Sequence, residues 1–236
     1  MSGERLTDLP TIWTTIISAH TPGPAGQQAM NELVGRYHDA VKQYLRLKLR
    51  DQNLADEVHQ EFWTKLLAHK LAGADRAKGR FRDYLRTVLH RLIIDHFRAK
   101  KLQSLPPGDL VDPTAPDADF DLAWREAVMK RVWSRLEMYE VSTPNNRYSK
   151  VLRLRTTNPK ASIEVLATRL SEQIQSQVTP EAFRKTLQRA RTKFLELLVL
   201  ELRETIHPAE PEDIEAEIHD LGLGNLYRRY TAESRS

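Results

Sequence analysis

The stretch GRFRDYLRTVLHRLIIDHFRAKK, residues 79–101, most constrains how this chain can fold. Its apolar residues recur at spacings of three and four without a break, which predicts one amphipathic helix of about five turns. The buried stripe of this helix would consist of Phe81, Tyr84, Leu85, Val88, Leu89, Leu92, Ile93 and Phe97. The face turned to solvent or to a partner would carry Asp83, Thr87, His90, Arg91, Arg98 and Lys101.

The charge on this helix is one-sided. Seven Lys or Arg residues lie between positions 80 and 101, against the two acids Asp83 and Asp95. A basic helix face is most often only a solvated surface. Here the basic residues end in the cluster Arg98, Lys100 and Lys101, which favours binding to a polyanion. The pattern therefore predicts a helix that binds nucleic acid.

Composition excludes several classes of protein. The 236 residues contain no cysteine, which excludes disulfides and thiolate metal sites and fits a reducing cytosol. No run of about 18 apolar residues occurs, so we expect no membrane span, and the first residues do not have the pattern of a secretory signal. The net charge of +4 is small, so affinity for nucleic acid must come from local clusters.

Helical spacing dominates the chain and strand-like alternation is nearly absent, so we expect an all-α fold. Between residues 103 and 120 the periodicity stops, and four prolines with several acids mark a linker between domains. We therefore expect two small helical domains joined by a flexible acidic linker. The expected divisions are a first domain at 1–102, the linker at 103–120, a second domain at 121–206 and a C-terminal extension at 207–236.

Two further helices carry distinctive faces. The helix expected at 54–69 has an apolar row on one side and an acidic cluster on the other, which is usually only a solvated face. The helix expected after Thr179-Pro180-Glu181 has a hydroxyl cap, a proline in its first turn and an acid near the positive end of its dipole. Together with a preceding helix capped by Ser162, it predicts a helix-turn-helix or an ordinary helical pair.

With these features in place, the chain resembles the extracytoplasmic-function (ECF) sigma factors, small bacterial initiation factors that keep only the two domains needed for promoter recognition. Residues 79–101 look like the helix that melts and reads the minus-ten promoter element. LADEVHQEFW, residues 54–63, looks like the acidic helix that binds the β′ clamp of RNA polymerase. VTPEAFRKTLQRARTKFL, residues 178–195, resembles the recognition helix for the minus-thirty-five element.

The resemblance implies a role for each group of residues. Core RNA polymerase would be bound by Asp56, Glu57, Gln60 and Glu61. The minus-ten element would be contacted by Lys78, Arg80, Arg86, Thr87, His90, Arg91, Arg98 and Lys101. The minus-thirty-five element would be contacted by Thr179, Glu181, Arg184, Lys185, Gln188, Arg189 and Arg191.

The same resemblance implies a cytoplasmic initiation factor with core RNA polymerase and promoter DNA as partners, and an anti-sigma protein or a Ser/Thr kinase as a possible regulator. It implies no cofactor, no metal and no catalytic group, because the chemistry belongs to the polymerase. Thr64 follows Gln60 and Glu61 by one helical turn. A phosphate there would add about −1.5 to −2 charges to the acidic face, which gives the hypothesis that Thr64 is a phosphorylation site; the alternative is an ordinary surface threonine.

The chain departs from the family pattern at three places. Leu54 stands where the family's acidic helix commonly opens with aspartate, and Arg91 stands where the central helix often has asparagine. The turn that follows Leu170 is longer than the family's tight one.

Other functions compete with this interpretation. A polymerase-independent helix-turn-helix regulator would share the second domain but would have little use for an acidic helix. A polymerase-binding adaptor would not need the basic recognition helix. The eight histidines show no metal-ligand spacing and no Gly-rich phosphate loop occurs, so an enzyme is not expected.

Overall fold

The computed structural model describes residues 12–19, 21–67, 80–99, 117–143, 145–206, 210–225 and 227–228. The described residues form nine helices of eight residues or more, further helical residues at 224–225 and 227–228, and no strand, apart from one isolated bridge between Arg80 and Ile206. The prediction of an all-α protein is therefore confirmed. The helices are α1 (Ile12–Ala19), α2 (Pro24–Leu49), α3 (Gln52–Leu67), α4 (Phe81–Ala99), α5 (Ala118–Ser142), α6 (Tyr148–Thr157), α7 (Ile163–Ile174), α8 (Pro180–Arg203) and α9 (Pro211–Asp220).

The chain packs into two compact units. Unit 1 comprises residues 1–127 and 202–217, and unit 2 comprises residues 128–201 and 218–236. These units do not coincide with the division expected from the sequence, because residues 202–217 pack with the first part of the chain. Most of the expected linker, residues 103–116, lies outside the described residues. None of the described helices is both long enough and apolar enough to cross a membrane.

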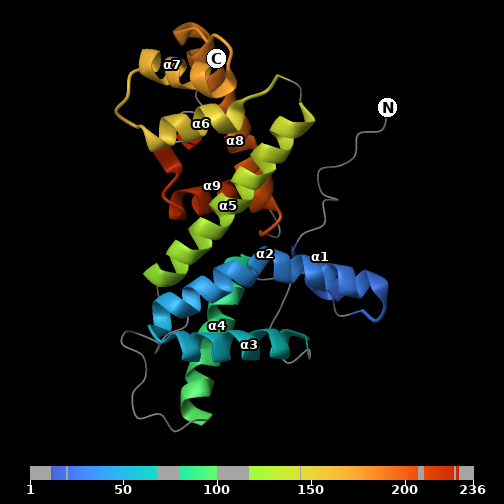
Figure 1. Cartoon of the computed structure of the whole chain (residues 1–236). Helices are drawn as coiled ribbons and strands as arrows, with labels where there is room; N and C mark the ends of the chain where they lie inside the picture. The colour runs from blue at the N-terminus through green and yellow to red at the C-terminus, as the bar shows by residue number, and fades with distance from the viewer. Residues whose placement is uncertain are drawn as a thin grey trace. The chain divides into compact units, whose positions relative to one another are not determined.

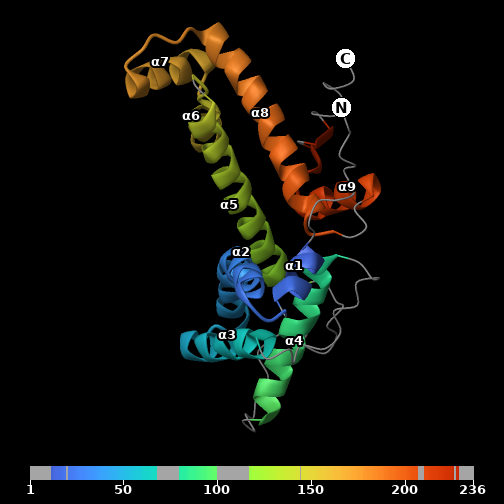
Figure 2. The same ribbon diagram turned by 90° about the vertical axis from the view of Figure 1, so that its right-hand side faces the viewer.

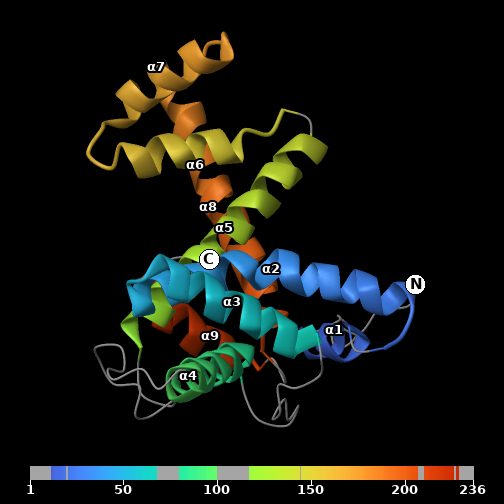
Figure 3. The ribbon, with the colours of Figure 1, turned by 60° about the horizontal axis from the view of Figure 1, so that its bottom comes forward.

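In unit 1, α2 lies beside α3, and α3 crosses α4 (Figures 1 and 3). The core is filled by side chains that expose 1% of their surface or less, among them Tyr44, Leu45, Leu89, Ile93 and Trp124. Burying one such apolar side chain contributes about 1.5–3 kcal/mol. The apolar stripe predicted for residues 79–101 forms this core, so the basic residues of α4 are held on a rigid element.

Local sequence fixes the position of α3. Helix α2 ends where Arg50 takes a left-handed conformation with φ 53°. Asp51 then accepts a hydrogen bond from the backbone N–H of Leu54 at 3.0 Å, which satisfies one donor at the start of the next helix. The short break turns the chain and begins α3 at Gln52. The acidic face of α3 therefore starts one turn after a defined cap.

In unit 2, α8 runs beside α5, with α6 and α7 at one end of the pair (Figure 2). Trp133 of α5 packs edge-on against Phe194 of α8, with ring centroids 5.2 Å apart. The buried carboxylate of Glu201 on α8 forms ion pairs with the guanidinium groups of Arg131 at 2.5 Å and Arg135 at 3.0 Å. Both arginines belong to α5, so these ion pairs join the same two helices. The predicted caps are also present, since Ser162 precedes α7 and Thr179 precedes α8.

Candidate nucleic-acid interface

Arg91 and Arg98 form the exposed basic face of α4. They are seven residues apart, which is about two helical turns, so their side chains extend from one side of the helix. Within the described residues neither guanidinium has an ion pair. This face can therefore offer two positive charges to phosphate groups. The predicted contacts Lys78 and Lys101 lie outside the described residues.

Arg86 and Thr87 are engaged on their own helix. The guanidinium of Arg86 lies 3.2 Å from the Asp83 carboxylate, and the Thr87 hydroxyl donates to the Asp83 carbonyl at 2.8 Å. Both side chains are half-buried. They lie near the outer face of α4, but a phosphate would have to compete with Asp83 for Arg86.

Arg80 is held by an acid from the distant C-terminal part of the chain. Its guanidinium lies 3.0 Å from Glu217 on α9, whose side chain is only 1% exposed. Arg82 approaches the same carboxylate at 3.3 Å, and the indole N–H of Trp124 donates to it at 3.0 Å. The predicted DNA contact Arg80 is therefore paired with a buried carboxylate of the chain itself.

The expectation that His90 faces outward is wrong. His90 is 1% exposed, and its Nε2 lies 2.8 Å from the carboxylate of Asp117. Lys48 lies 3.0 Å from the same oxygen, and the Tyr44 hydroxyl donates to it at 3.0 Å. Burial alone would raise the pKa of Asp117, but hydrogen bonds from His90 and Lys48 hold it well below its usual range. His90 is therefore a buried partner of Asp117 and not part of the exposed face of α4.

The acidic residues of α3 do not share one environment. Glu57 and Gln60 are exposed, whereas Asp56 is half-buried and lies 3.4 Å from Lys42. Glu61 lies 2.8 Å from Lys65 and 3.0 Å from His96 of α4. Burial opposes ionisation of Glu61, but these hydrogen bonds outweigh it and lower its pKa. The face therefore presents the carboxylates of Glu57 and Glu61 one helical turn apart.

Helices α7 and α8 are the two helices of the predicted pair in unit 2, of which the second, α8, is basic. The Thr179 hydroxyl accepts the backbone N–H of Ala182 at 3.1 Å, which caps α8. Helix α7 continues to Ile174, and Gln175 ends it in a left-handed conformation with φ 51°. The connection is therefore the short segment 175–179. The exposed residues at the start of α8 are Glu181, Arg184, Lys185, Gln188, Arg189 and Arg191, with Lys185 paired to Glu181 at 2.9 Å.

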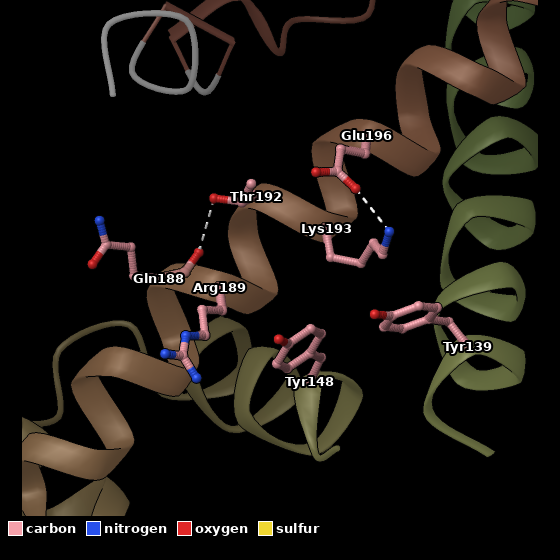
Figure 4. Close-up of a pocket in the computed structure, with 7 residues that line it drawn as sticks. All are labelled: Tyr139, Tyr148, Gln188, Arg189, Thr192, Lys193 and Glu196. Atoms are coloured by element: carbon pink, nitrogen blue, oxygen red, sulfur yellow. Dashed lines mark hydrogen bonds and ion pairs between the residues drawn. The ribbon is translucent and has the colours of Figure 1, made fainter. Parts of the chain in front are cut away.

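A hollow of about 450 Å³ lies beside the middle of α8 (Figure 4). Tyr139 of α5 and Tyr148 of α6 stack there with ring centroids 6.1 Å apart. The ammonium of Lys193 lies 4.5 Å from the Tyr139 ring and pairs with Glu196 at 2.8 Å. Gln188 and Arg189 line the same hollow. The two tyrosines thus adjoin the predicted recognition surface, although no pattern in the sequence had indicated them.

Comparison with known protein families gives a match over part of the chain. Residues 33–103 match the family model of sigma-70 region 2. The match supports a relation of this segment to the sigma-70 factors, and it does not single out the ECF subgroup. A search of curated proteins and a search of solved structures found no match.

The region 2 match spans α3 and α4 together with their flanking residues, and it includes every residue predicted to bind polymerase or the minus-ten element. The α7–α8 pair lies outside it. Three functional contacts were not predicted from the sequence. Asp117 contacts His90, Glu217 contacts Arg80 and Arg82, and His96 contacts Glu61. Each lies far along the chain from at least one partner, so helical periodicity contained no signal for these contacts. Among the described residues, no group of His, Cys, Asp and Glu could hold a metal ion.

Proposed function

We propose that the chain is a bacterial transcription initiation factor of the ECF subgroup, which binds core RNA polymerase and directs it to specific promoters. The observation that carries the proposal is the juxtaposition of two faces in the region 2 match. Helix α3 presents Glu57, Gln60 and Glu61, and α4, which packs against it, presents Arg91 and Arg98. Acids of this kind pair with a basic polymerase surface, while the arginines bind the phosphates of the opened strand.

The proposed minus-ten surface consists of Arg91 and Arg98, with Arg86 at its edge. Unstacking a base costs a few kcal/mol, which strand capture by these cations must offset. In unit 2, Arg184, Lys185 and Gln188 would reach base edges in the major groove of the minus-thirty-five element, while Arg189 and Arg191 would contact phosphate. The protein would act in the cytoplasm, and all catalytic groups would belong to the polymerase.

The test is assembly with core RNA polymerase, followed by run-off transcription from genomic fragments. We expect stable co-elution with core enzyme and transcripts that start at defined promoters. Exchange of Glu57 and Glu61 for glutamine should weaken the complex about tenfold, because charged pairs across an interface are lost. Glu32→Gln removes an exposed acid on α2 and is the matched control, which should bind normally. Failure of the unaltered protein to bind core enzyme would refute the proposal.

A second candidate is a polymerase-independent DNA-binding regulator. The observation that favours it is the α7–α8 pair with its basic second helix, which lies outside the region 2 match. Such a protein would bind one duplex site tightly without polymerase. Selection of duplex fragments by the protein alone, compared with selection by its mixture with core enzyme, distinguishes the two functions.

We also propose that Thr64 is a site of regulation by a Ser/Thr kinase. It is exposed on α3, and its hydroxyl donates to the carbonyl of Gln60 at 2.8 Å. A phosphate would add about −1.5 to −2 charges beside the proposed polymerase-binding face. Thr64→Ala with full activity in cells under every inducing condition would remove this proposal. An anti-sigma protein would act instead by covering the face itself.

A further inference from the structure

His96 lies between the two acids of α3 that are proposed to bind polymerase. It belongs to α4 and is 8% exposed. Its Nδ1 lies 3.0 Å from the Glu61 carboxylate, and its Nε2 lies 3.5 Å from the Glu57 carboxylate. One imidazole ring from the helix proposed to bind DNA therefore faces both carboxylates proposed to bind polymerase.

The direction of the closer contact follows from charge. The pKa of Glu61 is lowered, so its carboxylate is ionised at neutral pH and can only accept hydrogen bonds. The Nδ1 atom of His96 must therefore carry the proton and donate it to Glu61. The Nε2 atom is buried and, within the described residues, has no hydrogen-bond partner, since 3.5 Å to Glu57 is too long for one.

The ring also lies where two acids of α3 repel each other. Glu57 and Glu61 are four residues apart, where like charges on a helix repel each other by a few tenths of a kcal/mol. Lys65 neutralises Glu61 from one side at 2.8 Å. His96 supplies a hydrogen-bond donor to Glu61 from the inner side of the helix. An exposed glutamate without such a donor would sample several rotamers, and binding would have to restrict them.

We infer that His96 is a positioning residue for polymerase binding. It holds the Glu61 carboxylate in one orientation beside Glu57, so that the two acids face the basic surface of the polymerase together. The inference rests on the proposed function. It also links the two faces of unit 1, because a change in the rotation of α4 would move His96 and with it the acids of α3. His96 itself does not need to touch the polymerase.

The chain offers variants that separate positioning from packing. His96→Leu fills the buried position with an apolar side chain and removes the hydrogen-bond donor. His96→Asn restores a donor at nearly the place of Nδ1. His59→Leu is the matched control, since His59 is also 8% exposed and lies on α3, but its Nε2 accepts from Trp63 at 3.0 Å and it has no contact with either acid.

The experiment measures the affinity of each full-length variant for core RNA polymerase, well below its unfolding temperature. We expect His96→Leu to weaken binding about tenfold, and His96→Asn and His59→Leu to remain within about threefold of the unaltered protein. In a background with Glu61→Gln, His96→Leu should have almost no additional effect, because the group it orients is already changed.

Three outcomes would overturn the inference: full affinity of His96→Leu, equal losses in His96→Leu and His59→Leu, or an undiminished effect of His96→Leu in the Glu61→Gln background. These outcomes are distinct from failure of the proposed function. If the unaltered protein does not bind core enzyme at all, the proposed function fails and the inference fails with it. If it binds and His96→Leu binds equally well, only the inference fails.

Discussion

At the scale of single residues, Asp117 is a buried carboxylate of unit 1 that is surrounded by hydrogen-bond donors. Its carboxylate is 3% exposed, and one of its oxygens, Oδ2, contacts Lys48, His90 and Tyr44. The other oxygen accepts the backbone N–H groups of Asp119 and Phe120, and so caps α5. A buried carboxylate with this many donors stabilises the fold only while it is ionised. Removing its charge would leave a buried ammonium group without a counter-ion.

Asp117→Asn should therefore lower the free energy of unfolding by about 3–5 kcal/mol at pH 7. The lowered pKa of Asp117 means that its carboxylate stabilises the fold above the pKa of the unfolded chain, about 4, and that this contribution is lost as the pH falls further toward the folded value. Urea unfolding of both proteins at pH 7 and pH 3 should show a smaller loss on acidification in the variant. Asp119→Asn, at a half-buried position, should cost less than about 1 kcal/mol.

At the scale of helices, α9 contributes to unit 1 through one buried acid. Glu217 binds Arg80, Arg82 and Trp124, and Arg82 also lies 2.5 Å from Asp121 of α5. Glu217→Gln should lower the free energy of unfolding by about 3–5 kcal/mol, because two arginines lose a shared buried counter-charge. Thermal unfolding measures the effect. Glu215→Gln changes an exposed acid of the same helix and should stay within about 0.5 kcal/mol, and equal stability of both variants would contradict the prediction.

The basic face of α4 should determine how the affinity for DNA depends on salt concentration. If Arg91 and Arg98 bind phosphates of the opened strand, replacing both with alanine should reduce the slope of log affinity against log salt by about 1.4 for single-stranded DNA. The measurement is titration of a minus-ten oligonucleotide into the complex with core enzyme at several salt concentrations. Arg125→Ala alters an exposed arginine of α5 and should leave the slope unchanged. An unchanged slope in the double variant would place the DNA elsewhere.

The helices were predictable because each carries its own apolar stripe and end signals. The spacing in residues 79–101 predicted α4, and Thr179-Pro180 predicted the start of α8. The extent of α7 was less accurate, since Ile174 continues the helix past Leu170 into the segment expected to be a turn. His90 was assigned to the wrong side because a period of 3.6 places it near the boundary of the stripe. Its buried partner Asp117 lies 27 residues away, so the local pattern contained no sign of this contact.

At the scale of the whole molecule, the chain returns to its first unit near its C-terminus. Residues 202–217 belong to unit 1, where Ile206 and Ile214 are buried and the backbone N–H of Phe81 donates to the carbonyl of Thr205 at 3.1 Å. The region 2 match ends at residue 103, before this segment. A fragment cut at the end of the match, or even at Ala127, would therefore expose apolar surface that the intact chain buries.

We expect the fragment 1–127 to lack cooperative unfolding and to bind hydrophobic dyes, because its core is left uncovered. The same fragment fused to residues 202–217 through a flexible Gly/Ser linker should regain a cooperative transition, since the missing apolar side chains and Glu217 are restored together. The control is the fusion with Ile214→Asp, which places a charge at a position that is 2% exposed and should behave like the fragment alone. Calorimetry and dye binding of the three proteins provide the comparison. A fragment 1–127 that unfolds as cooperatively as the fusion would mean that the first part of the chain is a complete domain, and that residues 202–217 only pack on its surface.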